Sequence, residues 1–275
     1  MTQRVTRFAP SPNGYLHLGH AFSALVGYHA AQENGGRFLL RIEDIDIGRA
    51  RPEFEQAIYD DLAWLGLEWE TPVRRQSEHF ADYKAAMEKL VALDVTYPCF
   101  CTRKEIVAAG GVQGPEGLVY PGTCRHMAAA EVKARRAKGE ISSLRIDTAK
   151  AQALLSSPLI WQEEEKGEII ADPTPLGDIV LARKDIPTSY HVAVVVDDAL
   201  QGITQVTRGL DLYEATPIHR LLQELLGLPV PIYHHHRLIT DEAGQRLAKS
   251  KGSPTLRDLR LAGVAPQEII SAIGL

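Results

Sequence analysis

Two histidines near the N-terminus stand three residues apart, in the segment Ala-Pro-Ser-Pro-Asn-Gly-Tyr-Leu-His-Leu-Gly-His that covers residues 9–20. Its prolines and Gly14 predict a turn, after which the apolar spacing of an amphipathic helix begins. His17 and His20 would then share one face of the first helical turn, where backbone N–H groups and the helix dipole attract anions. Gly19 between them would let a planar ligand approach the backbone. We expect the anion to be a nucleotide phosphate.

An isolated pair of histidines with this spacing would more simply be solvated or part of a core. The block Arg-Phe-Ala-Pro-Ser-Pro-Asn-Gly that precedes the pair resembles the opening of class I aminoacyl-tRNA synthetases of the glutamyl type, and this resemblance favours a binding site instead.

A second set of reactive side chains lies between residues 99 and 124. Cys99-Phe-Cys101 is followed, after a glycine-rich stretch, by Cys124. An odd number of crowded cysteines favours a metal site in a reducing compartment over disulfides, although three buried cysteines without a metal remain the alternative. Three thiolates suit a tetrahedral structural zinc, and the imidazole of His126 is the better fourth ligand on chemistry alone. Such a zinc would fold an insertion too small for a core of its own.

Composition limits the class of protein. The chain has 275 residues, of which 45% are hydrophobic, so it can bury a substantial core as one large α/β domain with an insertion. It has no apolar run as long as a bilayer span and no signal sequence, which predicts a cytoplasmic protein without membrane contact. Because the net charge is −5, a nucleic acid would have to bind a local basic patch.

The elements that must position these residues alternate between helices and strands. A helix from His17 to about Gln32 is stopped by Gly35-Gly36, and a buried strand at Arg37–Ile42 delivers Glu43 and Asp44 to a site. We expect further helices at 53–65, 79–94, 131–138 and 215–226, a buried strand at 190–198, a histidine-rich strand at 233–239 and two short helices at the C-terminus. Short strands should also fill the region up to residue 181.

Four separated segments resemble class I aminoacyl-tRNA synthetases of the glutamyl type. His17-Leu-Gly-His20 is similar to the HIGH signature of that family. Arg41-Ile-Glu-Asp-Ile-Asp46, the stretch from Pro52 to Trp69, and Arg246-Leu-Ala-Lys-Ser250 follow in the order of the family pattern. The resemblance covers most of the chain.

This resemblance implies an α/β fold, namely a Rossmann-like nucleotide-binding domain of the class I synthetase type with a zinc-bearing insertion and a short helical C-terminal part. Residues 1–96 and 171–232 would form the two halves of the catalytic domain. Residues 97–170 would be the acceptor-type insertion, and residues 233–275 would hold the lysine loop and the last helices.

The reaction implied is the activation of an amino acid, in which its α-carboxylate attacks the α-phosphate of ATP. Charge builds on the phosphate oxygens, so positioned cations and N–H donors are needed. By resemblance, His17, His20 and Lys249 are catalytic and bind ATP together with Gly19, with Mg²⁺ accompanying the nucleotide. Lys249 lies in a loop that resembles the KMSKS signature, but Arg246 and Ala248 replace the first lysine and the first serine.

By the same resemblance the amino-acid substrate is L-glutamate. Arg7 and Arg208 would hold its side-chain carboxylate, since planar guanidinium groups suit that partner. Glu43 and Tyr190 would lie near its ammonium group, with Ser11 as a hydrogen-bond partner. The remaining residues assigned to this pocket are Phe8, Ala9 and Pro10.

For the zinc site, the family offers a second candidate for the fourth ligand. The spacing from Tyr120 to Cys124 matches the Cys-x-Cys…Tyr-x-x-x-Cys arrangement of shortened relatives, whereas His126 would complete the Cys₃His site of some glutamyl-tRNA synthetases. We favour Tyr120, with Cys99, Cys101 and Cys124 as the other ligands.

The chain ends soon after Lys249, so we expect no anticodon-binding domain. This architecture resembles the glutamyl-Q tRNA(Asp) synthetases, paralogues that activate glutamate without tRNA and attach it to queuosine in the anticodon loop of tRNA(Asp). A monomer is expected, which would grip that loop with Arg135, Arg136 and Lys138. Two alternatives stay open: charging of a tRNA 3′ end, and a nucleotide-binding zinc protein without enzymatic activity.

Overall fold

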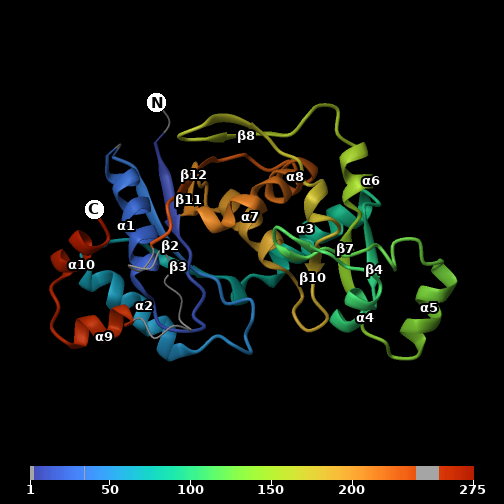
Figure 1. The fold of residues 1–275 in the computed structure, drawn as a ribbon, viewed down its shortest axis with the longest axis horizontal. Helices are drawn as coiled ribbons and strands as arrows, with labels where there is room; N and C mark the ends of the chain where they lie inside the picture. Colours follow the sequence, from blue (N-terminus) through green and yellow to red (C-terminus); the bar gives the residue numbers. More distant parts are fainter. Residues whose placement is uncertain (1–2, 34, 240–253) are drawn as a thin grey trace.

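The computed structural model describes residues 3–33, 35–239 and 254–275. The molecule is elongated, with the C-terminal helices at one end and the insertion at the other (Figure 1). The helices are α1 Leu18–Gln32, α2 Pro52–Trp64, α3 Phe80–Ala92, α4 Arg103–Ala108, α5 Ala129–Ala137, α6 Thr148–Ala153, α7 Tyr190–Leu200, α8 Thr216–Leu226, α9 Leu256–Leu261 and α10 Pro266–Ala272, with 3₁₀ turns η1 Gln76–Glu78, η2 Thr174–Leu176 and η3 Leu210–Ala215. The strands are β1 Val5–Phe8, β2 Arg37–Ile42, β3 Glu70–Arg75, β4 Thr96–Cys99, β5 Gln113–Gly114, β6 Gly117–Leu118, β7 Ser143–Ile146, β8 Ile160–Glu163, β9 Gly167–Ile170, β10 Val180–Ala182, β11 Gln205–Gly209 and β12 Ile232–His236.

Two sets of parallel strands lie side by side. Strands β1, β2 and β3 pair in that order, and β11 pairs with β12, all in parallel. The sets meet at Val5, whose carbonyl accepts the backbone N–H of Thr204 at 3.0 Å and whose N–H donates to the Thr204 hydroxyl at 2.8 Å. The resulting order is β3-β2-β1-β11-β12, which reverses between β1 and β11. Ligands of open α/β sheets bind at the carboxyl ends of the strands beside such a reversal.

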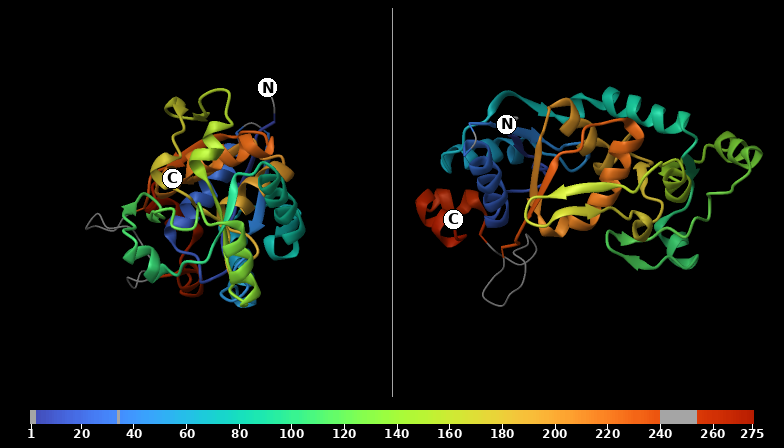
Figure 2. Two further views of the ribbon diagram at one scale, coloured as in Figure 1. Left: turned by 90° about the vertical axis from the view of Figure 1, so that its right-hand side faces the viewer. Right: turned by 90° about the horizontal axis from the view of Figure 1, so that it is seen from above.

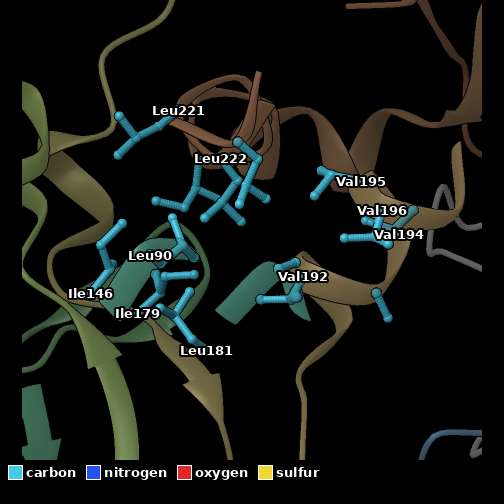
Figure 3. Close-up of a cluster of buried hydrophobic side chains, with 14 of the residues drawn as sticks. Leu90, Ile146, Ile179, Leu181, Val192, Val194, Val195, Val196, Leu221 and Leu222 are labelled. Atoms are coloured by element: carbon cyan, nitrogen blue, oxygen red, sulfur yellow. The ribbon is translucent and has the colours of Figure 1, made fainter. Parts of the chain in front are cut away.

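The largest apolar cluster connects this sheet to the insertion. Figure 3 shows Leu90 of α3 facing Leu221 and Leu222 of α8, with Val192 of α7 and Ile146 of β7 beside them. All five side chains are buried. A second cluster lies between α1, β2 and α2 and includes Leu256 of α9, Ile269 of α10 and Ile273, which directly follows α10. The C-terminal helices are therefore packed onto the half of the molecule that contains α1, β2 and α2.

The prediction of a strand at residues 190–198 is wrong, because this segment is helix α7. Val192 to Val196 are buried on every side of helix α7, which packs against both α3 and α8. A short run of β-branched residues without a polar face has no helical periodicity to reveal it, and burial overrides the strand propensity of valine. The other expected helices are confirmed, as is the strand at 37–42. The strand expected at 233–239 is present but shorter, because β12 ends at His236.

The insertion is built on an antiparallel sheet in the order β10-β7-β4, with α4, α5 and the β5–β6 hairpin around it. Seen from above in Figure 2, this region projects from the sheet. Strand pairing does not follow the expected domain boundary at residue 170. Strand β8 precedes that residue but pairs with β12 of the parallel sheet, and β10 follows it but pairs with β7 of the insertion. The domain limits stay a prediction. None of the described helices is long and apolar enough to cross a membrane.

Candidate active site

A cavity of about 440 Å³ opens at the carboxyl ends of β1, β11 and β12. It lies at the reversal of strand order, where a ligand site is expected. Its lining includes every predicted glutamate- and nucleotide-site residue in the described part of the chain: Arg7, Phe8, Ala9, Pro10, Ser11, His17, Gly19, His20, Glu43, Tyr190 and Arg208. Lys249 lies outside the described residues.

The two histidines cap helix α1. His17 is the N-cap residue, and its Nδ1 accepts the backbone N–H of Gly19 at 3.1 Å. The Nδ1 of His20 accepts the backbone N–H of His17, also at 3.1 Å. An Nδ1 atom that accepts a hydrogen bond carries no proton, so each ring holds its proton on Nε2. The predicted pair is thus a pair of oriented N–H donors beside a helix N-terminus.

The structure gives a second reason for glycine at position 19, in addition to the approach of a ligand. A Cβ atom at this position would lie 3.0 Å from Cε1 and 3.2 Å from Nδ1 of His17. A side chain would therefore push the His17 ring away from the backbone N–H that it caps.

Arg7 is paired within the protein. Its guanidinium donates to both carboxylate oxygens of Asp198, from Nε at 3.0 Å and from Nη2 at 3.3 Å. Arg41 donates to the same carboxylate at 2.8 Å and to Glu43 at 3.1 Å. Burial would raise the pKa of Asp198, but Arg7 and Arg41 outweigh it and hold that pKa below its ordinary value. At Glu43 burial dominates over both arginines and raises the pKa.

Arg208 is held differently. Arg208 is 4% exposed, and its guanidinium donates to Nε2 of His235 at 3.0 Å, to Nδ1 of His219 at 3.0 Å and to the hydroxyl of Thr216 at 2.8 Å. The Tyr190 hydroxyl lies 3.4 Å from its Nη1. No carboxylate of the described residues lies within 4.0 Å of this guanidinium, so an anion in the cavity can pair with it.

The three cysteines form a cluster in the insertion. The Sγ atoms of Cys99, Cys101 and Cys124 all lie within 4.8 Å of one another, with 3.5 Å between Cys101 and Cys124. A tetrahedral ion with bonds of about 2.3 Å holds its sulfur ligands roughly 3.8 Å apart. The cluster could therefore hold a metal ion.

Of the two candidates for a fourth ligand, Tyr120 lies against the sulfurs. Its hydroxyl is 3.4 Å from Sγ of Cys101 and accepts the backbone N–H of Cys124 at 2.8 Å. The guanidinium of Arg145 lies 4.0 Å from the centre of its ring, which places a cation beside the thiols. The ring nitrogens of His126 do not join the atoms that lie within 4.8 Å of one another.

Comparison with known proteins decides the family. A family model described as "tRNA synthetases class I (E and Q), catalytic domain" matches residues 3–275. The chain belongs to this family. A glutamyl-Q tRNA(Asp) synthetase of Rhodobacter capsulatus is 47% identical over 98% of this chain and all of its own length. A glutamate–tRNA ligase of Aquifex aeolicus is 38% identical over the whole chain, which covers 57% of that protein.

A solved structure agrees with this assignment to the class I synthetases. The glutamate–tRNA synthetase of Elizabethkingia anophelis superposes with a TM-score of 0.77 at 30% identity. The match covers 92% of this chain and 55% of that one, so the chain spans about half the length of this synthetase. The predicted fold class is confirmed.

The sequence analysis missed the residues that hold the cavity arginines. They are Asp198, which pairs with Arg7, and His219 and His235, which contact Arg208. Two adjacent aspartates at the end of an apolar run need partners when buried, so Asp197-Asp198 carried a signal. A strand prediction for this run gives the two aspartates no buried cationic partner and so does not reveal their role.

Proposed function

We propose that this protein activates L-glutamate with ATP in the absence of tRNA, and then transfers the glutamate to queuosine in the anticodon loop of tRNA(Asp). The proposal rests on the family, and on relatives named glutamyl-Q tRNA(Asp) synthetase that are 39–47% identical over 96–98% of the chain. One observation carries the substrate assignment. The buried guanidinium of Arg208, held by neutral groups only, shares a cavity with the donor-rich N-terminus of α1.

In this proposal the glutamate side chain lies at the arginine end of the cavity. Its γ-carboxylate accepts from Arg208 and from the part of Arg7 that faces the cavity. Glu43, which lines the same cavity, meets the ammonium group, and the Tyr190 hydroxyl supports it. The α-carboxylate then points toward α1.

The phosphates of ATP lie at the N-terminus of α1. The Nε2–H groups of His17 and His20 donate to phosphate oxygens as negative charge grows on them during attack by the α-carboxylate. Lys249, which lies outside the described residues, is proposed to supply a cation to the same phosphates, and Mg²⁺ accompanies the nucleotide. The result is glutamyl adenylate and pyrophosphate.

The acceptor can approach through a neighbouring cavity of about 450 Å³. This cavity shares Ser11, Asn13, Glu43 and Tyr190 with the first, so it opens beside the reacting carbonyl.

We propose further that Cys99, Cys101, Cys124 and Tyr120 hold a structural Zn²⁺. Arg135 and Arg136 lie on the exposed helix α5, where they could contact tRNA phosphates. The monomeric state and the cytoplasmic location stay predictions.

The activation step is tested by glutamate-dependent exchange of pyrophosphate into ATP without tRNA. We expect exchange with L-glutamate and little with L-glutamine or L-aspartate. Exchange that appears only when tRNA(Glu) is added would favour charging of a tRNA 3′ end. If no amino acid supports exchange, either with or without tRNA, the protein would be a nucleotide-binding protein that lacks this activity.

A further inference from the structure

The four side chains that contact the Arg208 guanidinium are all uncharged. The guanidinium donates to His235, His219 and Thr216, and lies near the Tyr190 hydroxyl. His219 is 1% exposed and Thr216 is fully buried, so water does not replace these partners. The substrate cavity is the side on which the guanidinium remains accessible.

The positions of the protons follow from Arg208 itself, because a guanidinium has donors only. Nδ1 of His219 must accept, which leaves its proton on Nε2 and directs it to Nδ1 of His191 at 3.1 Å. Nε2 of His235 must also accept, so its Nδ1–H donates to Glu163 at 2.7 Å. Each ring is therefore fixed in one neutral tautomer by two hydrogen bonds.

Burial keeps the rings in this state. It lowers the pKa of His219 well below the ordinary histidine value and that of His191 to about 4, and the charge of Arg208 lowers both further. Burial also lowers the pKa of His235, against the opposing effect of Glu163. These residues consequently stay neutral near pH 7.

The nearest contrast is Arg7 in the same cavity. Its charge is met by the carboxylate of Asp198 at 3.0 Å. Within the described part of the chain, Arg208 reaches a carboxylate only indirectly, since the His235 ring accepts from Arg208 and donates to Glu163. That carboxylate also accepts the backbone N–H of His235 at 2.9 Å and the indole N–H of Trp161 at 3.3 Å.

We propose that His219 is a specificity-determining residue. It contacts Arg208 with an uncharged acceptor and so leaves the charge of the guanidinium to be paired by a substrate carboxylate. A dicarboxylic amino acid completes the site, whereas its amide leaves a buried cation unpaired. His191 is the residue that holds the His219 ring in position. The inference rests on the proposed function and adds the origin of its selectivity.

The test compares His219→Asp with His219→Asn. A carboxylate at this position would pair with Arg208 and compete with the substrate, whereas an amide would preserve a neutral acceptor. In tRNA-free exchange we expect His219→Asp to raise KM for glutamate about 30- to 100-fold with kcat within about 3-fold, because the lost ion pairing acts on binding. The preference for glutamate over glutamine should fall about 100-fold, and His219→Asn should stay within about 5-fold of wild type.

His79→Asp is the matched control. His79 precedes α3, is 35% exposed and lines neither cavity. It should leave KM and the substrate preference unchanged. If His219→Asp does not fold, Thr216→Asp places the carboxylate on the other side of the guanidinium, at the first residue of α8, where a negative charge suits the helix dipole.

Binding of glutamate and glutamine by calorimetry, without ATP, separates the two levels of the proposal. If the wild-type protein binds glutamate and His219→Asp keeps the same affinity and preference, the inference about His219 is overturned and the proposed function is not. Equal losses in His219→Asp and His219→Asn also overturn it, since they indicate that only the position of Arg208 matters. Wild-type protein that binds no glutamate overturns the proposed function and the inference together.

Discussion

The parallel-sheet region and the cysteine segment, residues 97–127, are stabilised by different means. In the sheet region, Asp198 accepts from Arg7 and Arg41, and the neighbouring Asp197 accepts from Arg74 and Tyr83. The same region also contains two large clusters of buried apolar side chains. The apolar cluster of the cysteine segment is small, and three of its five buried members are the ligand candidates Cys99, Tyr120 and Cys124. The sheet region is thus stabilised by its own buried ion pairs and apolar packing. The cysteine segment instead has a set of ligands with which a metal ion could stabilise it.

The largest effect should come from breaking the charge network of the sheet region. Asp198→Asn leaves two buried guanidinium groups without their shared anion, and losing one partner of a buried pair costs about 3–5 kcal/mol. We expect the free energy of unfolding, measured in urea, to fall by that amount. The control Asp185→Asn removes an exposed pair with Arg183 and should cost less than about 1 kcal/mol. Equal losses in the two variants would contradict the difference between the buried and exposed pairs.

Acidification should weaken the sheet region by a smaller amount. The unfolded chain takes up a proton on His191 below about pH 6.5, whereas the folded protein does so only near pH 4. Because the unfolded state then binds more protons, the free energy of unfolding should fall between these pH values, by up to roughly 3 kcal/mol from this residue. Urea titrations at several pH values measure the slope. His191→Asn should reduce it, and an unchanged slope would show that His191 is not buried in its neutral form.

Metal removal should have the smallest effect on global stability and a distinct local one. Cys124→Ser should release the metal and speed hydrogen exchange across residues 97–127, while the free energy of unfolding of the sheet region changes by less than about 1 kcal/mol. Transfer to tRNA should fall more than adenylate formation. Mass spectrometry of hydrogen exchange and metal analysis check both points. Purified wild-type protein with almost no zinc would contradict the structural role of the cluster.

Comparison of two further variants identifies the fourth ligand. Tyr120→Phe removes the hydroxyl that contacts Cys101 but keeps the ring beneath Arg145. It should weaken zinc binding about 10- to 100-fold, in the range typical when support around a metal is lost, whereas His126→Ala should leave binding nearly unchanged. The reverse order would assign the site to His126.

The sequence predicted those parts of the fold and site that depend on local signals. The turn before His17, the apolar spacing of α1 and the crowded cysteines all gave correct placements. It failed at α7, because Val192–Val196 are buried on all sides and show no helical period. Partners distant in sequence, such as Arg7 and Asp198 or Arg208 and His219, come together only when β1, α7, β11 and α8 pack. No local pattern contains that information.

The central claim is that glutamate, activated without tRNA, is transferred to queuosine in tRNA(Asp). The most direct measurement labels two samples of tRNA(Asp) with radioactive glutamate, one carrying queuosine and one carrying unmodified guanosine at the same anticodon position, and then maps the labelled nucleotide. We predict label on the queuosine sample alone, at the anticodon nucleotide. Equal labelling of both samples, or label confined to the 3′-terminal adenosine, would contradict the account.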